Sequence, residues 1–208
     1  MLQFITHQTA QYNYVEGAVE ALNGGCKWIQ LRMKGADIED IRQAVAILKP
    51  LCLHHEATLI LDDQVELTAQ LDVDGVHLGK NDMPPNEART ILGKKFIIGG
   101  TANTFEDIKL LVSQGVDYIG LGPFRYTQTK QNLSPILGLD SYKNILSQCH
   151  THGIEIPIVA IGGIRKDDIC SIMNCGVSGI AMSGAILQSG NPAQATHNII
   201  TTLNKLKK

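Results

Sequence analysis

An amide and two cations alternate in the segment that closes the second apolar run of the sequence. Gln30, Arg32 and Lys34 occupy every other position there, and in an extended chain this spacing points all three side chains the same way. Two cations that converge with an amide indicate a binding site for an anionic ligand. A solvated strand end with surface charges would carry the same residues, so this run alone leaves both interpretations open.

Carboxylates follow the next two apolar runs. Asp62 and Asp63 come after one run, and Asp82 comes after the other. Because neighbouring parallel strands carry neighbouring loops, we expect Asp63 and Asp82 to approach each other, and two carboxylates that share a site repel unless a cation lies between them. Mg²⁺ is commonly held by one or two carboxylates and by phosphate oxygens, so the pair predicts a magnesium site. The alternative is that Asp62 or Asp63 caps the following helix.

Small and hydroxyl-bearing residues follow three later runs. Thr101 offers a hydroxyl after two glycines that would let a ligand approach the backbone. A glycine turn followed by a helix N-cap at Asn103 or Thr104 is the alternative. Gly163 and the pair Ser183 and Gly184 follow the last two runs. Barrels of parallel strands build phosphate sites from backbone N–H groups at these places, so phosphate is preferred here over tight turns made for packing.

One long irregular stretch, residues 122–138, follows the sixth run. It contains Arg125, Thr127, Thr129 and Lys130, which are two cations and two hydroxyls. A loop of this length in a compact domain is usually functional. We interpret it as a lid that closes over phosphate groups and excludes water, the alternative being an exposed polar loop.

The elements that must position these residues alternate along the chain. Short apolar runs are each followed by a longer segment with helical spacing. The sequence predicts strands at Leu2–Thr6, Trp28–Leu31, Thr58–Leu61, Gly75–Leu78, Phe96–Gly99, Tyr118–Leu121, Pro157–Ile161 and Gly179–Met182. It predicts helices that begin near Tyr14, Ile38, Val65, Pro85, Thr104, Leu139, Arg165 and Pro192.

This alternation predicts the α/β class and, within it, a TIM (β/α)₈ barrel that forms a single domain over residues 1–208. Runs such as LILDD and IVAIGG are apolar throughout, as expected for parallel strands that helices cover. An open doubly wound sheet is the alternative, but the first strand lacks the glycine-rich turn that such folds carry. In a TIM barrel the active site lies at the carboxyl ends of the strands, where all the polar segments above fall.

Composition narrows the classes of function. The formal net charge of -2 favours neither nucleic acid nor a membrane surface as a partner. Five scattered cysteines without CxxC spacing argue against a disulfide framework. The first residues do not read as a signal peptide, and no apolar run reaches membrane-spanning length. We therefore expect a cytoplasmic protein whose partners are small molecules, and a homo-oligomer is compatible with this composition.

Together these segments resemble the thiamine phosphate synthase family. The resemblance extends over nearly the whole chain, and the matching segments are QLRMK at 30–34, DD at 62–63, DGVHLGKND at 74–82, GPFRYTQTK at 122–130, IVAIGGI at 158–164 and AMSGAI at 181–186. The first and fourth of these, present in one barrel, are fairly specific to that family.

The resemblance implies an Mg²⁺-dependent transferase that joins a pyrimidine diphosphate to a thiazole phosphate and releases pyrophosphate. A pyrimidine methyl cation, formed as the C–O bond to pyrophosphate breaks, would be trapped by the thiazole nitrogen. By position, the pyrimidine diphosphate would be held by Gln30, Arg32, Lys34, Asp62, Thr101 and Lys130. The thiazole phosphate would be held by Thr127, Thr129, Gly163, Ser183 and Gly184, and magnesium by Asp63 and Asp82. The expected catalytic residues are Arg32, Lys34, Thr101 and Lys130.

Two positions depart from the family pattern. The family usually has Asn-Asp where this chain has Asp62 and Asp63, and serine where it has Thr101. An aspartate at position 62 could accept a hydrogen bond from a pyrimidine amino group, but it could not donate as an amide does.

Three rival interpretations remain from the residues alone. A related thiazole tautomerase would move a proton, with His7 as the nearest carrier, but it would not need the acidic pair or the lysines; a structural or solvent-facing His7 is preferred. A non-catalytic phosphate-binding barrel is the second rival. The third is a metal site made from Cys52, His54 and His55 with Cys149, His150 and His152, whose spacing matches no standard site.

Overall fold

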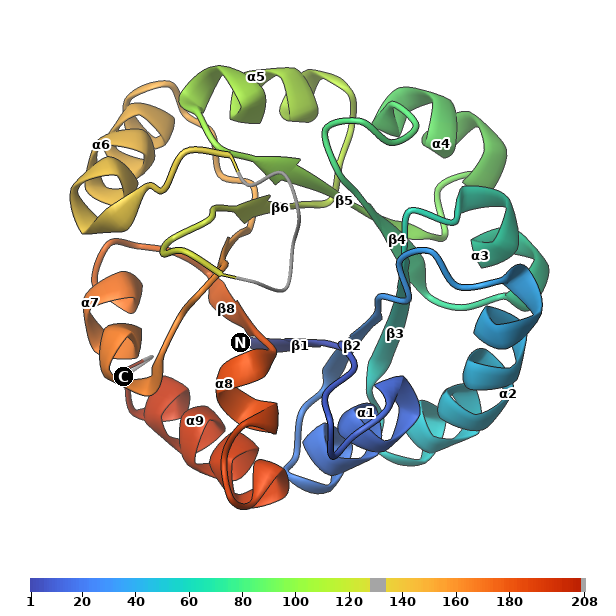
Figure 1. Ribbon diagram of the computed structural model, residues 1–208. Helices are drawn as coiled ribbons and strands as arrows, with labels where there is room; N and C mark the ends of the chain where they lie inside the picture. The colour runs from blue at the N-terminus through green and yellow to red at the C-terminus, as the bar shows by residue number, and fades with distance from the viewer. Residues whose placement is uncertain (128–133, 207–208) are drawn as a thin grey trace.

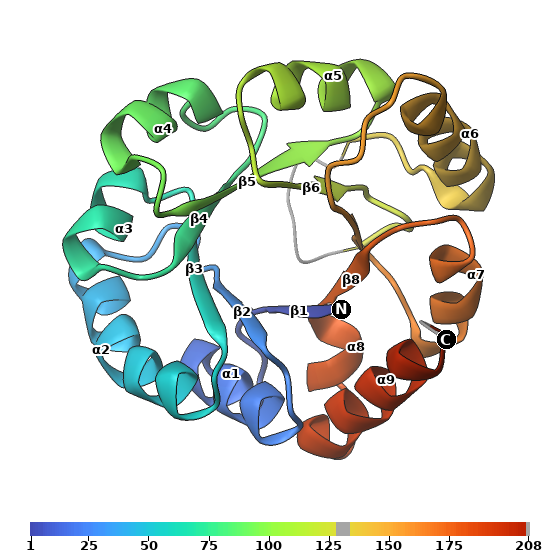
Figure 2. The same ribbon diagram turned by 180° about the vertical axis from the view of Figure 1, so that it is seen from behind.

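The computed structural model describes residues 1–127 and 134–206, and in these residues parallel strands close into a barrel in the order β1 to β8. Figures 1 and 2 show the helices arranged in a ring around this sheet. The strands are β1 (Leu2–Ile5), β2 (Trp28–Leu31), β3 (Thr58–Asp62), β4 (Gly75–Leu78), β5 (Ile97–Ala102), β6 (Tyr118–Leu121), β7 (Ile158–Ile161) and β8 (Gly179–Met182). The predicted TIM barrel is therefore confirmed.

The helices that cover the sheet alternate with the strands. They are α1 (Tyr14–Asn23), α2 (Ile38–His54), α3 (Val65–Leu71), α4 (Pro85–Leu92), α5 (Phe105–Ser113), α6 (Gly138–Thr151), α7 (Ile169–Met173), α8 (Gly184–Leu187) and α9 (Pro192–Leu206), with a 3₁₀ turn η1 (Lys166–Asp168) before α7. No helix in the described part of the chain is long and apolar enough to cross a membrane.

The barrel closes where β1 pairs with β8, with Phe4 opposite Met182 in the register. Side chains alternate along each strand between the barrel interior and the helices. The outward-facing set, which includes the fully buried Phe4 and Ile29, packs in one core with the helices. This two-sided burial explains why the strands are apolar at nearly every position.

The barrel interior has an apolar floor and a polar layer nearer the rim. Trp28, Ile60, Tyr118, Val159 and Ala181 form the buried apolar cluster inside the sheet. The ring of Trp28 packs edge-on against Tyr118 with centroids 4.7 Å apart, which gives this tryptophan a packing role. This apolar cluster fills the lower part of the barrel interior. A binding site is therefore expected at the carboxyl ends of the strands.

Most elements lie within one residue of their predicted bounds, and the larger differences concern β5, α7 and α8. Strand β5 continues to Ala102 instead of ending at Gly99, because its glycines lie in the ladder beside β6. Helix α8 was not predicted, since four residues are too few to show a helical period. The seventh helix begins as the turn η1, where the Asp168 carboxylate accepts from the N–H of Arg165 at 2.9 Å.

Candidate active site

Two of the alternating residues after β2 converge on one carboxylate at the rim. Gln30 Nε2 donates to Asp62 Oδ1 at 2.8 Å, and Arg32 Nε lies 3.5 Å from Asp62 Oδ2. Burial raises the pKa of Asp62, and the positive charges of Arg32 and Lys34 oppose that rise. The ion pair with Arg32 at this position favours the ionised carboxylate.

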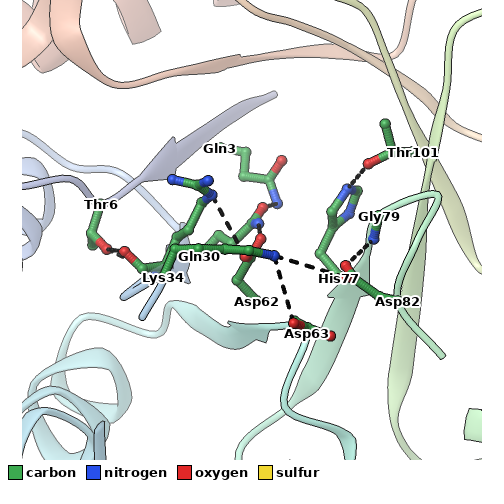
Figure 3. Close-up of polar contacts among 11 residues, drawn as sticks. Gln3, Thr6, Gln30, Lys34, Asp62, Asp63, His77, Gly79, Asp82 and Thr101 are labelled. Atoms are coloured by element: carbon green, nitrogen blue, oxygen red, sulfur yellow. Dashed lines mark hydrogen bonds and ion pairs between the residues drawn. The ribbon is translucent and has the colours of Figure 1, made fainter. Parts of the chain in front are cut away.

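The third residue, Lys34, lies beyond the end of β2 and turns to a different pair of carboxylates. Its Nζ lies 3.6 Å from Asp63 Oδ2 and 3.8 Å from Asp82 Oδ1. Figure 3 shows the lysine reaching between the two acids. Asp82 is held in place because its Oδ2 accepts from the N–H of Gly79 at 2.6 Å. The expected approach of Asp63 to Asp82 is confirmed, with one cation between them.

Mutual repulsion marks this acidic pair. Burial, followed by the negative charge of Asp82, raises the pKa of Asp63, while Lys34 opposes the rise. Asp63 also has a left-handed backbone, with φ of 72°, which is unfavourable for a residue with a Cβ. Both features concentrate strain at one residue of the rim, a pattern associated with functional sites.

Helix capping does not account for these aspartates. The N-cap of α3 is Gln64, and its side chain makes no capping hydrogen bond. Asp62 and Asp63 contact the helix only through their carbonyl oxygens, which accept from the N–H groups of Gln64 and Val65. Their carboxylates face the rim, so the capping alternative is wrong.

A pocket of about 490 Å³ opens beside this charged cluster, above β1 and β5 to β8. Six of the residues proposed from the sequence line it, namely Arg32, Thr101, Thr127, Gly163, Ser183 and Gly184. Asp62, Asp63 and Lys34 instead line a smaller neighbouring hollow of about 70 Å³. Arg32 is therefore the residue that joins the charged cluster to the main pocket.

Glycines around the pocket make room for protein atoms. A Cβ on Gly99 would lie 2.2 Å from the ring of Tyr118, and one on Gly100 would lie 2.6 Å from Leu111. The expectation that these glycines admit a ligand is wrong, because side chains fill the space. Gly163 has φ of 67° and its Cβ position is 2.7 Å from the carbonyl oxygen of Arg125. It lines the pocket, and it is also a tight packing turn.

Both described ends of the 122–138 loop are anchored to the barrel. The N–H groups of Phe124 and Arg125 donate to Ile161 and Gly162 at 2.9 and 3.0 Å, and Arg125 Nη2 binds Asp168 Oδ1 at 2.5 Å. On the other side, Asn103 Nδ2 donates to the carbonyl of Pro135 at 2.8 Å. Thr129 and Lys130, to which the sequence assigned phosphate binding, lie outside the described residues.

Helix α5 resolves another alternative from the sequence. Thr104 is its N-cap and accepts from the N–H of Asp107, whose carboxylate accepts from the N–H of Thr104 in return. Thr101 lies in β5 before this cap and points to the pocket. The cap and the pocket residue are thus separate features of one short segment.

Sequence reasoning gave too little weight to His7. It lies just after β1 and lines the pocket, and its Nδ1 is 3.1 Å from Ser183 Oγ. Burial, and then the charge of Arg32, lowers the pKa of His7. The preferred assignment was a structural or solvent-facing histidine. Its solvent-facing alternative is wrong, because the side chain is half-buried and lines the pocket. A single histidine after a strand carried the signal, without a partner in the sequence to support it.

Sequence reasoning also missed a buried network that we call the polar arc. It spans β1 to β6 inside the barrel and consists of Asp62, Gln30, Gln3, Tyr118, His77 and Thr101. His77 is a hydrogen-bonded histidine of the barrel interior. A glutamine inside an apolar strand, as at Gln3, was the available signal.

The cysteine and histidine metal site has no support. In residues 1–127 and 134–206, no three His, Cys, Asp or Glu residues lie close enough together to hold a metal ion. Cys52 and Cys149 are buried in the core, and their helices α2 and α6 lie on opposite sides of the ring (Figure 1).

The matches to known sequences all belong to one protein family. The sequence profile described as thiamine monophosphate synthase matches residues 2–186. A thiamine-phosphate synthase of Bacteroides fragilis is 62% identical over 199 residues, which are 96% of this chain and 98% of that protein. One from Bacteroides thetaiotaomicron is 57% identical over 206 residues, or 99% of each chain.

A solved structure agrees with the sequences. Thiamine phosphate pyrophosphorylase from Pyrococcus furiosus superposes with a TM-score of 0.87 and is 31% identical, and the match covers 99% of this chain and 96% of that one. The similarity therefore covers the whole barrel and its rim.

Proposed function

The chain belongs to the thiamine monophosphate synthase family and is a transferase, and from this premise we propose that it joins a pyrimidine diphosphate to a thiazole phosphate and releases pyrophosphate. The observation that carries the proposal is the rim arrangement, in which Arg32 and Lys34 face three carboxylates beside a pocket of about 490 Å³. With two cations against three carboxylates, such a rim suits an anionic diphosphate that binds together with a divalent cation.

Breakage of the C–O bond to pyrophosphate places negative charge on the leaving group. Arg32 and Lys34 offer positive charge within the site, and we assign the same role to Lys130 from its sequence position. These groups stabilise the developing charge more than they stabilise the bound substrate, and that difference is what lowers the barrier. Thr101 adds a hydroxyl on the same side of the pocket.

The acidic pair fits magnesium. Asp63 and Asp82 repel each other and both contact the Lys34 ammonium, so the rim already holds positive charge where a cation would lie. Two carboxylates plus diphosphate oxygens form the oxygen-rich set that Mg²⁺ prefers. We propose that Asp63 and Asp82 hold the ion, which when bound would neutralise diphosphate charge.

The thiazole phosphate is assigned to the main pocket. The described residues Thr127, Gly163, Ser183 and Gly184 line it together, and Thr129 joins them by sequence position. Hydroxyls and small residues at the ends of β7 and β8 suit a phosphate group, because they leave backbone N–H groups accessible. The thiazole ring nitrogen would then face the pyrimidine at Thr101 and Arg32.

The proposed intermediate is a pyrimidine methyl cation, and water would quench it. Closure of the 122–138 loop over the pocket would exclude water, as lids do in other enzymes. The described parts of this loop are anchored to the barrel at Arg125 and Pro135. The cation needs no protein nucleophile, and no cysteine lines the described part of the pocket.

The proposal is tested by incubating the protein with both phosphorylated substrates and Mg²⁺. We expect equal amounts of pyrophosphate and thiamine phosphate. Release of pyrophosphate without the thiazole would show that the pyrimidine ionises alone. Absence of both products under these conditions, from protein with intact secondary structure, would contradict the proposed reaction.

A further inference from the structure

The polar arc connects the carboxylate of Asp62 to the hydroxyl of Thr101 through four buried side chains. Gln30 Nε2 donates to Asp62 at 2.8 Å, and Gln30 Oε1 accepts from Gln3 Nε2 at 3.2 Å. The same Gln3 nitrogen donates to the Tyr118 hydroxyl at 3.2 Å. Figure 3 shows the two glutamines side by side, with His77 against Thr101 on the far side.

The arc continues from Tyr118 through the imidazole of His77. Tyr118 Oη lies 2.8 Å from His77 Nδ1, and His77 Nε2 lies 2.9 Å from Thr101 Oγ1. Room for this packing exists because Gly99 leaves space for the Tyr118 ring and Gly120 leaves space for the His77 ring. Both rings are buried, so each polar atom depends on its partner in the arc.

The direction of these hydrogen bonds follows from the geometry at the Asp62 end. Gln30 presents its NH₂ to the Asp62 carboxylate and its oxygen to Gln3. Gln3 donates to Gln30 and to Tyr118. The phenol that accepts from Gln3 has one proton to donate, and the imidazole of His77 is the acceptor that the described residues place beside it.

The remaining steps fix the tautomer of the histidine. A Tyr118 hydroxyl that donates to Nδ1 requires the tautomer of a neutral ring with its proton on Nε2. In that tautomer His77 donates to Thr101 Oγ1. The hydroxyl proton of Thr101 then points away from the arc, and Thr101 lines the main pocket.

We propose that Gln3, Tyr118 and His77 are positioning residues that transmit the polarity of the Asp62 carboxylate, so that the Thr101 hydroxyl serves the pocket as a hydrogen-bond donor. A neutral amide at position 62 could either accept or donate, and the whole arc could then run in reverse. In the reversed arc Thr101 would donate to His77 and offer the pocket only its lone pairs. The carboxylate removes this ambiguity.

The tautomer can be measured without any substrate. Nitrogen-15 NMR of the histidine rings distinguishes protonated from unprotonated ring nitrogens, and His77→Gln assigns the signals. We expect His77 to carry its proton on Nε2 alone. A proton on Nδ1 in the unmodified protein would overturn the proposal.

The origin of the polarity is tested by Asp62→Asn. We expect a second signal set in this variant, with His77 protonated on Nδ1, because the amide permits both directions. If His77 remains a single Nε2-protonated species, the carboxylate does not set the direction and that part of the proposal is wrong.

A kinetic test asks whether Tyr118 acts through Thr101, and this part rests on the proposed synthase reaction. We expect Tyr118→Phe to lower kcat about tenfold, the size expected for loss of one hydrogen bond. Thr101→Val should lower it as well, and the double variant should be no slower than Thr101→Val. Independent, multiplying effects would show that Tyr118 does not act through Thr101.

The matched control is Tyr142→Phe. Tyr142 is also fully buried and its hydroxyl donates to the carbonyl of Leu121, but it belongs to the outer core and lies outside the arc. We expect its removal to change stability and not kcat. An equal loss of kcat in Tyr118→Phe and Tyr142→Phe would assign the effect to general destabilisation. Lack of synthase activity in the unmodified protein would refute the reaction, while the tautomer result would still stand.

Discussion

His7 and Ser183 lie at the ends of neighbouring strands, and their side chains meet over the pocket with Nδ1 3.1 Å from Oγ. Burial, and then the positive charge of Arg32, lowers the pKa of this histidine, so the ring is neutral at neutral pH. A bound phosphate would reverse this, because a nearby anion favours the charged imidazolium. We predict that the pKa of His7 rises by about one unit or more when the thiazole phosphate binds.

The sign of the pH effect follows from the same shift. A histidine whose pKa is higher in the complex takes up a proton when the ligand binds. The affinity for the phosphate therefore increases as the pH falls from the pKa of His7 in the complex to its pKa in the free protein. NMR titration of His7 with and without the ligand measures both values. Binding of the phosphate to the His7→Asn variant should lack the pH dependence that protonation of His7 contributes. If the pKa of His7 is the same in the free protein and in the complex, the phosphate does not bind beside His7.

Asp63 combines an unfavourable backbone with a charge that we assign to magnesium binding, so function and stability should separate there. Glycine adopts a φ of 72° without steric cost, and Asp63→Gly should raise the free energy of unfolding by about 1 kcal/mol while abolishing synthesis. Asp63→Asn keeps a side chain that tolerates this conformation and removes only the charge.

Asp63→Asn should therefore be inactive with nearly unchanged stability, and Asp82→Ala should also be inactive and folded. Urea unfolding and pyrophosphate release measure the two properties. Full activity of Asp63→Asn or Asp82→Ala in the presence of EDTA would remove the magnesium assignment.

The sequence was sufficient for the barrel because the alternation of apolar runs and helical segments leaves few other topologies. It was also sufficient to bring Arg32, Lys34, Asp63 and Asp82 to one rim, since the carboxyl ends of parallel strands meet there. The sequence did not predict which acid each cation contacts. Lys34 was grouped with Arg32 because the two alternate, but Lys34 lies beyond the strand and contacts a different pair of carboxylates.

The interior of the barrel was harder to predict. Whether Gln3, His77 and Tyr118 face the inside or the helices depends on strand register and on neighbouring strands far along the chain. Gly99 shows the same limit, because the ring that fills its space comes from β6. No local pattern reveals which glycine admits a ligand and which admits a side chain.

Lys130 was chosen from its place in the loop sequence, and its role stays a prediction. We expect Lys130→Ala to lower kcat by a large factor, because a cation near the leaving group stabilises negative charge in the transition state. Steady-state kinetics with both substrates measures the effect. Lys109→Ala is the control, since Lys109 is exposed on α5 and pairs with Glu106. An unchanged rate in Lys130→Ala would mean that this lysine does not contact the diphosphate.

Gly99 supports the polar arc by leaving space, and a methyl group there should be costly. A Cβ at this position would lie 2.2 Å from the Tyr118 ring and 2.5 Å from its hydroxyl. Because β5 and the ring are both fixed in a packed interior, Gly99→Ala should lower the free energy of unfolding by ~3 kcal/mol. Gly190→Ala is the control, because no atom lies within 4 Å of its Cβ position.

Urea unfolding separates the two glycine variants, provided that the slope with denaturant stays constant. Gly190→Ala should remain within about 0.5 kcal/mol of the unmodified protein. The double variant Gly99→Ala/Tyr118→Leu replaces the ring by a smaller side chain. It should recover part of the lost stability, because the methyl group at position 99 then has the space that it needs. If Gly99→Ala proves as stable as Gly190→Ala, the Tyr118 ring does not occupy the position that orients His77, and the arc would have to run by another route.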